Sequence, residues 1–118
     1  MSWEYDQSSG IIRLNGAYMG KGYAGKGMGR DNPDMEKVGF TGPIPRGTYE
    51  IGEPYTHPIL GPIVMALEPV GHNAHGRTDF RIHGDNQTND ASEGCIVLPP
   101  IVRRKISESS VKKLEVVR

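Results

Sequence analysis

The sequence predicts a compact, mainly β domain with one or two short helices, spanning residues 1–118. Sixteen glycines and nine prolines indicate many turns. Short apolar stretches fall between these turns, and several of them alternate apolar and polar residues with the two-residue period of a strand. A chain of this length buries roughly two thirds of its unfolded surface, so it needs no disulfide to fold. We therefore expect six or seven short strands in a single domain.

The first thirty residues are expected to hold a hairpin and a glycine-rich segment. In residues 3–14, aromatic and aliphatic residues alternate with polar ones on both sides of a turn at residues 7–10. Residues 16–29 carry six glycines. Two interpretations of this segment stay open: a flexible loop, or a close-packed irregular segment in which glycine lets the backbone approach a neighbour or ligand.

The middle of the chain alternates turns and strands. Asn-Pro-Asp at residues 32–34 marks a turn, and the two prolines of residues 41–48 predict a rigid loop. Short strands are expected at residues 48–51 and 62–67 by their alternation or apolar length. In the strand at residues 80–83, Phe80 and Ile82 should face the core, which places Arg81 and His83 together on the opposite face.

The last quarter is expected to hold a polar loop, a strand, a helix and a final strand. Residues 84–93 are almost wholly polar, and residues 94–98 return to the apolar interior. Pro99-Pro100 suits the start of a helix, where a missing N–H costs nothing. The run Arg103-Arg104-Lys105 is then expected on the solvated face of that helix, and residues 114–117 close the chain as a strand.

Composition excludes several classes of function. The charges balance at 14 basic and 14 acidic residues, so the basic excess typical of a nucleic-acid-binding protein is missing. No apolar run approaches the roughly 20 residues of a membrane span. The start of the sequence has neither the basic nor the apolar region of a secretory signal peptide. We therefore expect a protein made in the cytoplasm, with no nucleic-acid partner and no membrane insertion.

One pair of residues carries candidate chemistry. A strand ends at His83, a polar loop runs out and back, and Gly94-Cys95 returns to the sheet. If the loop doubles back, His83 and the only cysteine lie side by side. A free thiol is only a few per cent thiolate at pH 7, and a neighbouring imidazole raises that fraction. A glycine before the nucleophile also leaves room for backbone N–H groups to face a developing oxyanion.

The motifs around this pair resemble those of the L,D-transpeptidases, the YkuD-type catalytic domains. The resemblance rests on His-Gly at residues 83–84, Ser-Glu-Gly-Cys-Ile at 92–96 and Gly-Pro-Ile-Pro-Arg-Gly-Thr-Tyr at 42–49. With Tyr-Ala-Gly-Lys-Gly at residues 23–27, the order is similar to that in small L,D-transpeptidase-like antibacterial effectors of type VI secretion. Glu93 stands where the transpeptidases have a second His, Val97 stands where they often have Arg, and the loop after His83 is shorter than usual.

The resemblance implies a YkuD-type β-sandwich or sheet and a cysteine mechanism without a cofactor. The Cys95 thiolate would attack the L-centre carbonyl of meso-diaminopimelate in a peptidoglycan stem tetrapeptide, and His83 would hold the ion pair and protonate the leaving D-Ala. Water as acceptor gives an L,D-carboxypeptidase, and a D-amino acid gives exchange. The resemblance also implies secretion into the periplasm of a rival cell, with secretion-system components and a cognate immunity protein as partners.

Other residues are candidates for supporting roles. Asp85 is expected to orient His83, to bind the substrate amine or simply to form a turn. Ser92 is expected to hydrogen-bond the catalytic loop. The remaining candidates, all for substrate binding, are Arg81, Arg77, Tyr23, Gly84 and Glu93.

Two alternatives from other classes were weighed against this interpretation. His72 and Asp79 have the spacing of a zinc D,D-peptidase, with His83 as a third ligand. No His follows His83 and a metal site leaves Gly94-Cys95 unexplained, so we expect no metal, and His57, His72 and His75 on surface loops. The other alternative is a non-catalytic peptidoglycan-binding or structural module, which would need no reactive thiol.

Overall fold

The computed structural model describes residues 1–86 and 92–118. Strands make up 38% of the chain and helices 16%, which confirms the mainly β prediction. The elements in chain order are β1 (Trp3–Asp6), β2 (Ile11–Leu14), β3 (Ala17–Lys21), β4 (Tyr23–Ala24), η1 (Gly27–Gly29), η2 (Pro33–Met35), β5 (Gly47–Ile51), β6 (Tyr55–His57), β7 (Gly61–Val70), η3 (Ala74–Gly76), β8 (Arg81–His83), β9 (Ile96–Val97), α1 (Pro100–Glu108) and β10 (Lys113–Val117).

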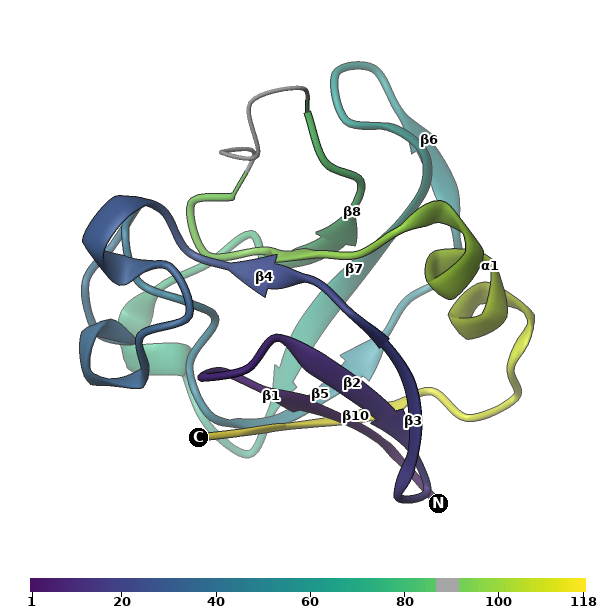
Figure 1. Cartoon of the computed structure of the whole chain (residues 1–118), viewed down its shortest axis with the longest axis horizontal. Coiled ribbons are helices and arrows are strands. Elements are labelled where there is room, and N and C mark those ends of the chain that lie inside the picture. Colours follow the sequence, from purple (N-terminus) through teal and green to yellow (C-terminus); the bar gives the residue numbers. More distant parts are fainter. Residues whose placement is uncertain (87–91) are drawn as a thin grey trace.

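The strands form one mixed sheet that closes around the core. Its order is β3-β2-β1-β10-β5-β7-β8-β9-β4, and β6 pairs with the edge of β7. The pairs β1–β10 and β8–β9 are parallel, whereas the remaining pairs are antiparallel. β3 and β4 lie at opposite ends of this order although only Gly22 separates them in the chain. The sheet must therefore curl back on itself, and Figure 1 shows β4 near β7 and β8, above β1, β2, β5 and β10 in the view.

The core lies inside this curled sheet and beneath α1. The strands contribute apolar side chains to this core at every second residue, because successive side chains point to opposite faces of the sheet. Burial of such apolar side chains is the main stabilising contribution to a fold of this size. The largest fully buried side chains are Trp3, Tyr5, Ile12, Ile44, Tyr49, Ile51, Met65, Ile82, Ile96, Leu98, Ile106 and Leu114.

The glycine-rich segment is where the sequence prediction of the fold was least accurate. It contains β3 and β4 rather than a flexible loop, and with the unpredicted β6 the described strands number ten instead of six or seven. A Cβ on Gly22 would overlap the carbonyl oxygen of Val97, and one on Gly20 would press on the Val102 side chain. The close-packed interpretation of this segment is therefore the correct one.

Helix α1 begins at Pro100, as the sequence predicted, but one of its basic residues is not solvated. Arg104 and Lys105 are exposed, whereas Arg103 is only 6% exposed. The Arg103 Nε donates to the Leu98 carbonyl at 3.0 Å and Nη1 to the Pro62 carbonyl at 2.6 Å. A buried cation is tolerated only when its donors are hydrogen-bonded, so these backbone carbonyls explain why Arg103 turns inward. No helix in the described part of the chain has the length and apolarity to cross a membrane.

Candidate active site

Two adjacent parallel strands bring His83 and Cys95 together. In the β8–β9 pair, Ile82 lies opposite Ile96 and His83 opposite Val97. Because side chains alternate along each strand, His83 and Cys95 point to the same face, one strand and two residues apart. Spacings of about 4.8 Å between strands and about 3.3 Å per residue put their Cα atoms roughly 8 Å apart, which the two side chains can bridge.

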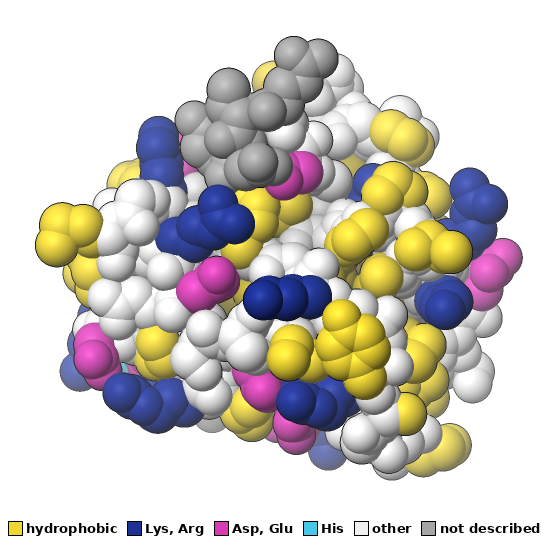
Figure 2. All heavy atoms as spheres, in the orientation of Figure 1, with side chains coloured by type: hydrophobic (Ala, Val, Ile, Leu, Met, Phe, Trp, Pro, Cys, Tyr) yellow, Lys and Arg dark blue, Asp and Glu magenta, His cyan; other side chains and the backbone are white. Residues whose placement is uncertain are grey.

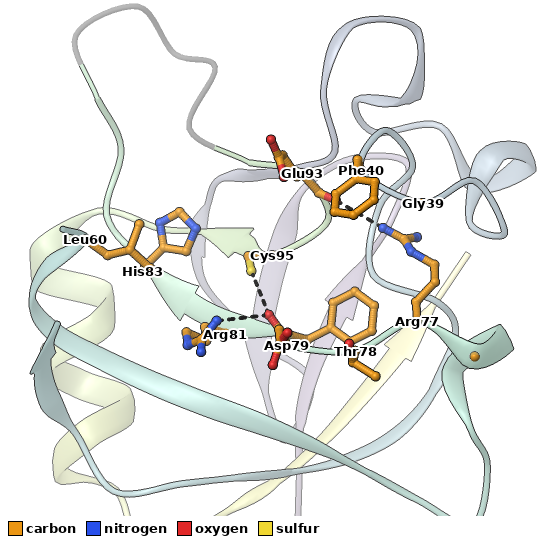
Figure 3. Close-up of a pocket in the computed structure, with 12 residues that line it drawn as sticks. Gly39, Phe40, Leu60, Arg77, Thr78, Asp79, Arg81, His83, Glu93 and Cys95 are labelled. Atoms are coloured by element: carbon orange, nitrogen blue, oxygen red, sulfur yellow. Dashed lines mark hydrogen bonds between the residues drawn. The ribbon is translucent and has the colours of Figure 1, made fainter. Parts of the chain in front are cut away.

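Both residues line an open cavity of about 590 Å³. Figure 3 shows the His83 ring beside Leu60 on one side of this cavity and Phe40 with Glu93 on the other, with the Cys95 sulfur between them. Cys95 is partly exposed, while His83 is 2% exposed. The sulfur is thus accessible to a ligand and the imidazole is shielded from bulk water.

The hydrogen bond of His83 determines its tautomer. Its Nδ1 lies 2.7 Å from the carbonyl oxygen of Gly84. A carbonyl only accepts, so Nδ1 carries the proton and the neutral ring has its lone pair on Nε2. Nε2 makes no hydrogen bond to the described residues. His83 is therefore prepared to accept a proton inside the cavity.

The sulfur of Cys95 is protonated in this arrangement. Sγ lies 3.5 Å from the carbonyl oxygen of Asp79, a contact that only an S–H can donate (Figure 3). Burial raises the pKa of the thiol above its ordinary value of 9.0. The Arg81 backbone N–H and the positive charges of Arg81 and Arg77 act in the opposite direction, because they stabilise the thiolate.

The pKa of His83 shifts the other way. Burial lowers it below 6.5, and the nearby positive charges of Arg103 and Arg81 lower it further, against the effect of the Gly84 carbonyl. A raised thiol pKa and a lowered imidazole pKa both favour the neutral pair over the thiolate–imidazolium ion pair. The directions of both pKa shifts favour a thiol and a neutral base in the free protein, whereas the resemblance implies an ion pair.

Ser92 and Gly94 fix the backbone turn that leads to the nucleophile Cys95. The Ser92 Oγ donates to the Cys95 carbonyl at 2.6 Å and accepts from the N–H groups of Gly94 at 3.0 Å and Gly25 at 2.9 Å. Gly94 has a φ of +140°, and a Cβ there would collide with Arg77. The Gly94 N–H is committed to Ser92, so an oxyanion donor at this turn has to be another backbone N–H near Cys95.

The two arginines differ in how free they are to bind a ligand. In Arg77, Nη1 donates to the carbonyls of Glu36 and Pro43, and Nη2 to those of Gly42 and Glu93. Of its five N–H donors only Nε remains, so its role in substrate binding stays a prediction with little structural support. Arg81 donates Nε to the Tyr55 hydroxyl and Nη1 to the Asp79 carbonyl, which leaves Nη2 without a partner among the described residues.

Three predicted residues lie at a second cavity instead. Tyr23, Gly84 and Asp85 line a hollow of about 630 Å³ that adjoins the first. The Asp85 carboxylate accepts from the Tyr23 hydroxyl at 2.6 Å and from the Asn86 N–H at 2.8 Å. Asp85 therefore does not orient His83, because the Gly84 carbonyl has that role.

The other histidines have structural partners of their own. His72 bonds the Thr48 carbonyl through Nε2 and the Ala74 N–H through Nδ1, which occupies both ring nitrogens. His75 lies 2.8 Å from the Glu36 carboxylate, and His57 accepts from the Ile59 and Leu60 N–H groups. Within residues 1–86 and 92–118, no three His, Cys, Asp or Glu side chains are grouped as metal ligands.

Sequence reasoning missed three residues of the first cavity. The carbonyl of Asp79 binds the thiol, and Phe40 and Leu60 form apolar walls on opposite sides. Phe40 is 78% exposed and has a φ of +61°, and Asp79 has a φ of +64°. Left-handed backbone at non-glycine residues cannot be read from the sequence, although it is often found near functional sites.

Comparison with protein families identifies the family of this chain. The Tlde1 domain matches residues 19–117, which is most of the chain. The chain belongs to the Tlde1 domain family. Tlde1 domains are L,D-transpeptidase-like effectors of type VI secretion, and membership suggests an antibacterial effector that modifies peptidoglycan. A search of curated proteins found no match. The match to the Tlde1 domain begins before β4 and includes both cavities.

Proposed function

We propose that this Tlde1 domain is a cysteine acyl-transfer enzyme that acts on the stem tetrapeptides of peptidoglycan. The observation that supports the proposal is that the accessible Cys95 sulfur and the His83 imidazole lie on one face of adjacent strands, with Nε2 of the imidazole unprotonated. A structural histidine or an inert cysteine needs neither an open cavity nor a vacant Nε2 beside the thiol.

Acylation begins from the neutral pair. Rotation about the Cα–Cβ bond of Cys95 turns the S–H away from the Asp79 carbonyl and toward His83 Nε2. The proton passes to Nε2 as the sulfur attacks the L-centre carbonyl of meso-diaminopimelate. The carbonyl π electrons move onto oxygen, and the Cys95 N–H is the nearest backbone candidate to donate to that oxyanion.

Collapse of the tetrahedral intermediate completes the first half-reaction. The C–N bond breaks, the D-Ala nitrogen takes the proton from His83, and a thioester remains on Cys95. An acceptor then attacks the thioester while His83 removes its proton, and the sulfur leaves as the acceptor bond forms. Water gives L,D-carboxypeptidase activity, and a D-amino acid gives exchange.

Charged groups around Cys95 suit a zwitterionic substrate. Arg81 lines the cavity beside the sulfur and has donors for a substrate carboxylate. Glu93 is exposed at the rim on the side away from His83 and has a carboxylate for a substrate ammonium group (Figure 3). We assign these two residues, rather than Arg77, to substrate binding.

This activity also explains how the protein would act as a toxin. Loss or capping of the terminal D-Ala removes the donor stems that a cell uses for cross-linking. We propose that the protein is made in the bacterial cytoplasm, delivered through type VI secretion components into the periplasm of a target cell, and neutralised in kin by an immunity protein.

Mass spectrometry of muropeptides tests the proposal. Purified tetrapeptide muropeptides are incubated with the protein, with and without D-methionine, in ¹⁸O-labelled water. Labelled tripeptides indicate hydrolysis, and D-methionine-capped stems indicate exchange, with an acyl adduct on Cys95 in both cases. Unchanged muropeptides together with an unmodified Cys95 in folded protein would overturn the proposal and favour a non-catalytic binding module.

A further inference from the structure

The second cavity adjoins the first across a shared wall. Leu60 lines both, and the consecutive residues His83 and Gly84 line one each. Figure 2 shows the face that carries β4, which is hollowed and bears Lys or Arg side chains at the edges of the hollow. A molecule bound at Cys95 can therefore extend past Leu60 into this second space.

The side chains that line the second cavity make it positive. Lys21, Arg30 and Arg103 line it, and the carboxylate of Asp85 is the single acidic group among the described lining residues. Arg30 pairs with Asp31 at 3.9 Å and stacks on the Tyr23 ring, so the excess charge is that of Lys21 and Arg103. That carboxylate is already satisfied by the Tyr23 hydroxyl and the Asn86 N–H. The charges of Lys21 and Arg103 therefore exceed the single negative charge of Asp85 on the cavity lining.

Arg103 directs a free donor group into this cavity. The side chain is 6% exposed, and its Nε and Nη1 bind three backbone carbonyls, those of Leu98, Pro62 and Ile63. Nη2 has no hydrogen-bond partner among the described residues, and it lies beside Gly84 at the cavity wall. A buried guanidinium edge with unused N–H groups is suited to a carboxylate, which accepts two parallel hydrogen bonds.

The N-terminal end of α1 adds to the positive electrostatic potential of the second cavity. Pro99 and Pro100 line the cavity, and Pro99 gives the helix no side-chain cap. The Arg103 N–H, which donates to the Pro99 carbonyl, closes the first turn. The amides of Ile101 and Val102 therefore belong to the uncapped positive end of the helix dipole, where an anion is stabilised.

We propose that this cavity binds a carboxylate of the stem peptide remote from the bond that Cys95 attacks. The proposal rests on the proposed function, since it treats the cavity as the extension of that substrate site. Arg103 binds the carboxylate directly, while Lys21 at the edge attracts it. The site selects stems whose carboxylates are free over stems in which they are amidated.

Kinetics of a charge-reversed variant test the proposal. Lys21→Glu is compared with Lys105→Glu, which changes net charge equally on the exposed far turn of α1. With a stem tetrapeptide, Lys21→Glu is expected to raise KM about 5- to 10-fold with kcat nearly unchanged, whereas Lys105→Glu changes neither. Amidation of the remote carboxylates should abolish the difference. Equal KM values for the two variants would overturn the proposal.

A binding measurement separates this site from the catalytic claim. Acetate is titrated into ¹⁵N-labelled wild-type protein and Lys21→Glu, with amide shifts followed by NMR. Shifts of the Ile101 and Val102 amides that weaken in the variant support the anion site even if no tetrapeptide is turned over. If acetate leaves these amides unshifted in the wild type, the anion site is refuted, whatever the catalytic result.

Discussion

The Oγ of Ser92 donates a 2.6 Å hydrogen bond to the carbonyl oxygen of Cys95. The Ser92 Oγ also accepts the N–H groups of Gly94 and Gly25, so one fully buried hydroxyl closes the turn before the nucleophile and ties it to the end of β4. No carboxylate or imidazole takes part in this contact. The position of the sulfur in the cavity thus depends on a serine that is fully buried.

Ser92→Ala is expected to displace the nucleophile. Three hydrogen bonds are lost and two buried N–H groups are left without acceptors, which should lower the free energy of unfolding by about 1–3 kcal/mol. A small misplacement of the sulfur should lower kcat/KM at least 10-fold. Ser107→Ala is the control, because Ser107 donates to one carbonyl on the surface of α1. Equal behaviour of the two variants in denaturant unfolding and D-Ala release would contradict the positioning role.

The reactivity of Cys95 should increase far into the alkaline range. Burial raises the pKa of the thiol above 9.0, so its thiolate fraction is small at neutral pH. The rate of alkylation by iodoacetamide is therefore expected to keep rising beyond pH 9. Arg81→Met removes a nearby positive charge, which should raise the thiol pKa further and slow alkylation at pH 8 about 3-fold. A rate that levels off below pH 8 would instead indicate a preformed thiolate–imidazolium pair.

Glu36 should make stability depend on pH in the acidic range. Burial raises its pKa, but hydrogen bonds from Gln7, His75 and Arg46 outweigh burial and lower it from 4.5 to about 2. The folded form thus prefers the carboxylate, which stabilises the protein above pH 4.5 and loses this effect as the pH falls toward 2. Glu36→Gln is expected to cost about 3 kcal/mol at pH 7 and much less at pH 2.5.

Urea unfolding at a series of pH values measures this effect. Glu108→Gln on the exposed end of α1 is the control and should stay close to the wild type throughout. A Glu36→Gln deficit of the same size at pH 7 and pH 2.5 would mean that the loss is one of packing and not of charge.

Removal of metal ions should leave the activity intact. Both ring nitrogens of His72 are occupied, and Nδ1 of His83 is protonated toward the Gly84 carbonyl. His72 could act as a zinc ligand only if one of its hydrogen bonds were broken, and the free Nε2 of His83 does not make a zinc site alone. D-Ala release should thus be the same before and after dialysis against EDTA. Loss of release on chelation, with recovery on adding zinc, would point to a metallopeptidase.

Much of the fold could be predicted because burial follows the pattern of the strands. The alternation around residues 3–14 located the β1–β2 hairpin, and the alternation at residues 80–83 located β8. Pro99-Pro100 located the start of α1. The segment 16–29 could not be assigned, because its strands depend on contacts between glycine backbone and distant chain, such as Gly22 against Val97. Such contacts produce no alternation of apolar and polar residues from which a strand could be predicted.

The parts of the candidate site that depend on strand order and alternation could be predicted. The parts that depend on hydrogen bonds between side chains and residues distant in sequence could not. The return of the polar loop placed His83 and Cys95 on one face, as register requires. Asp85 is adjacent to Gly84 in sequence, yet it turns to Tyr23. Arg103 binds carbonyls forty residues away, including that of Ile63. These hydrogen-bond partners depend on tertiary structure, which a single sequence does not reveal.

Release of D-Ala by Cys95→Ala, compared with the wild type on the same tetrapeptide muropeptides, tests the central claim most directly. Deletion of a sulfur that lines an open cavity should leave the fold and the unfolding midpoint nearly unchanged, which circular dichroism can verify. The account predicts that a folded Cys95→Ala protein releases no D-Ala above background and carries no acyl adduct. Release at the wild-type rate by that variant would contradict it.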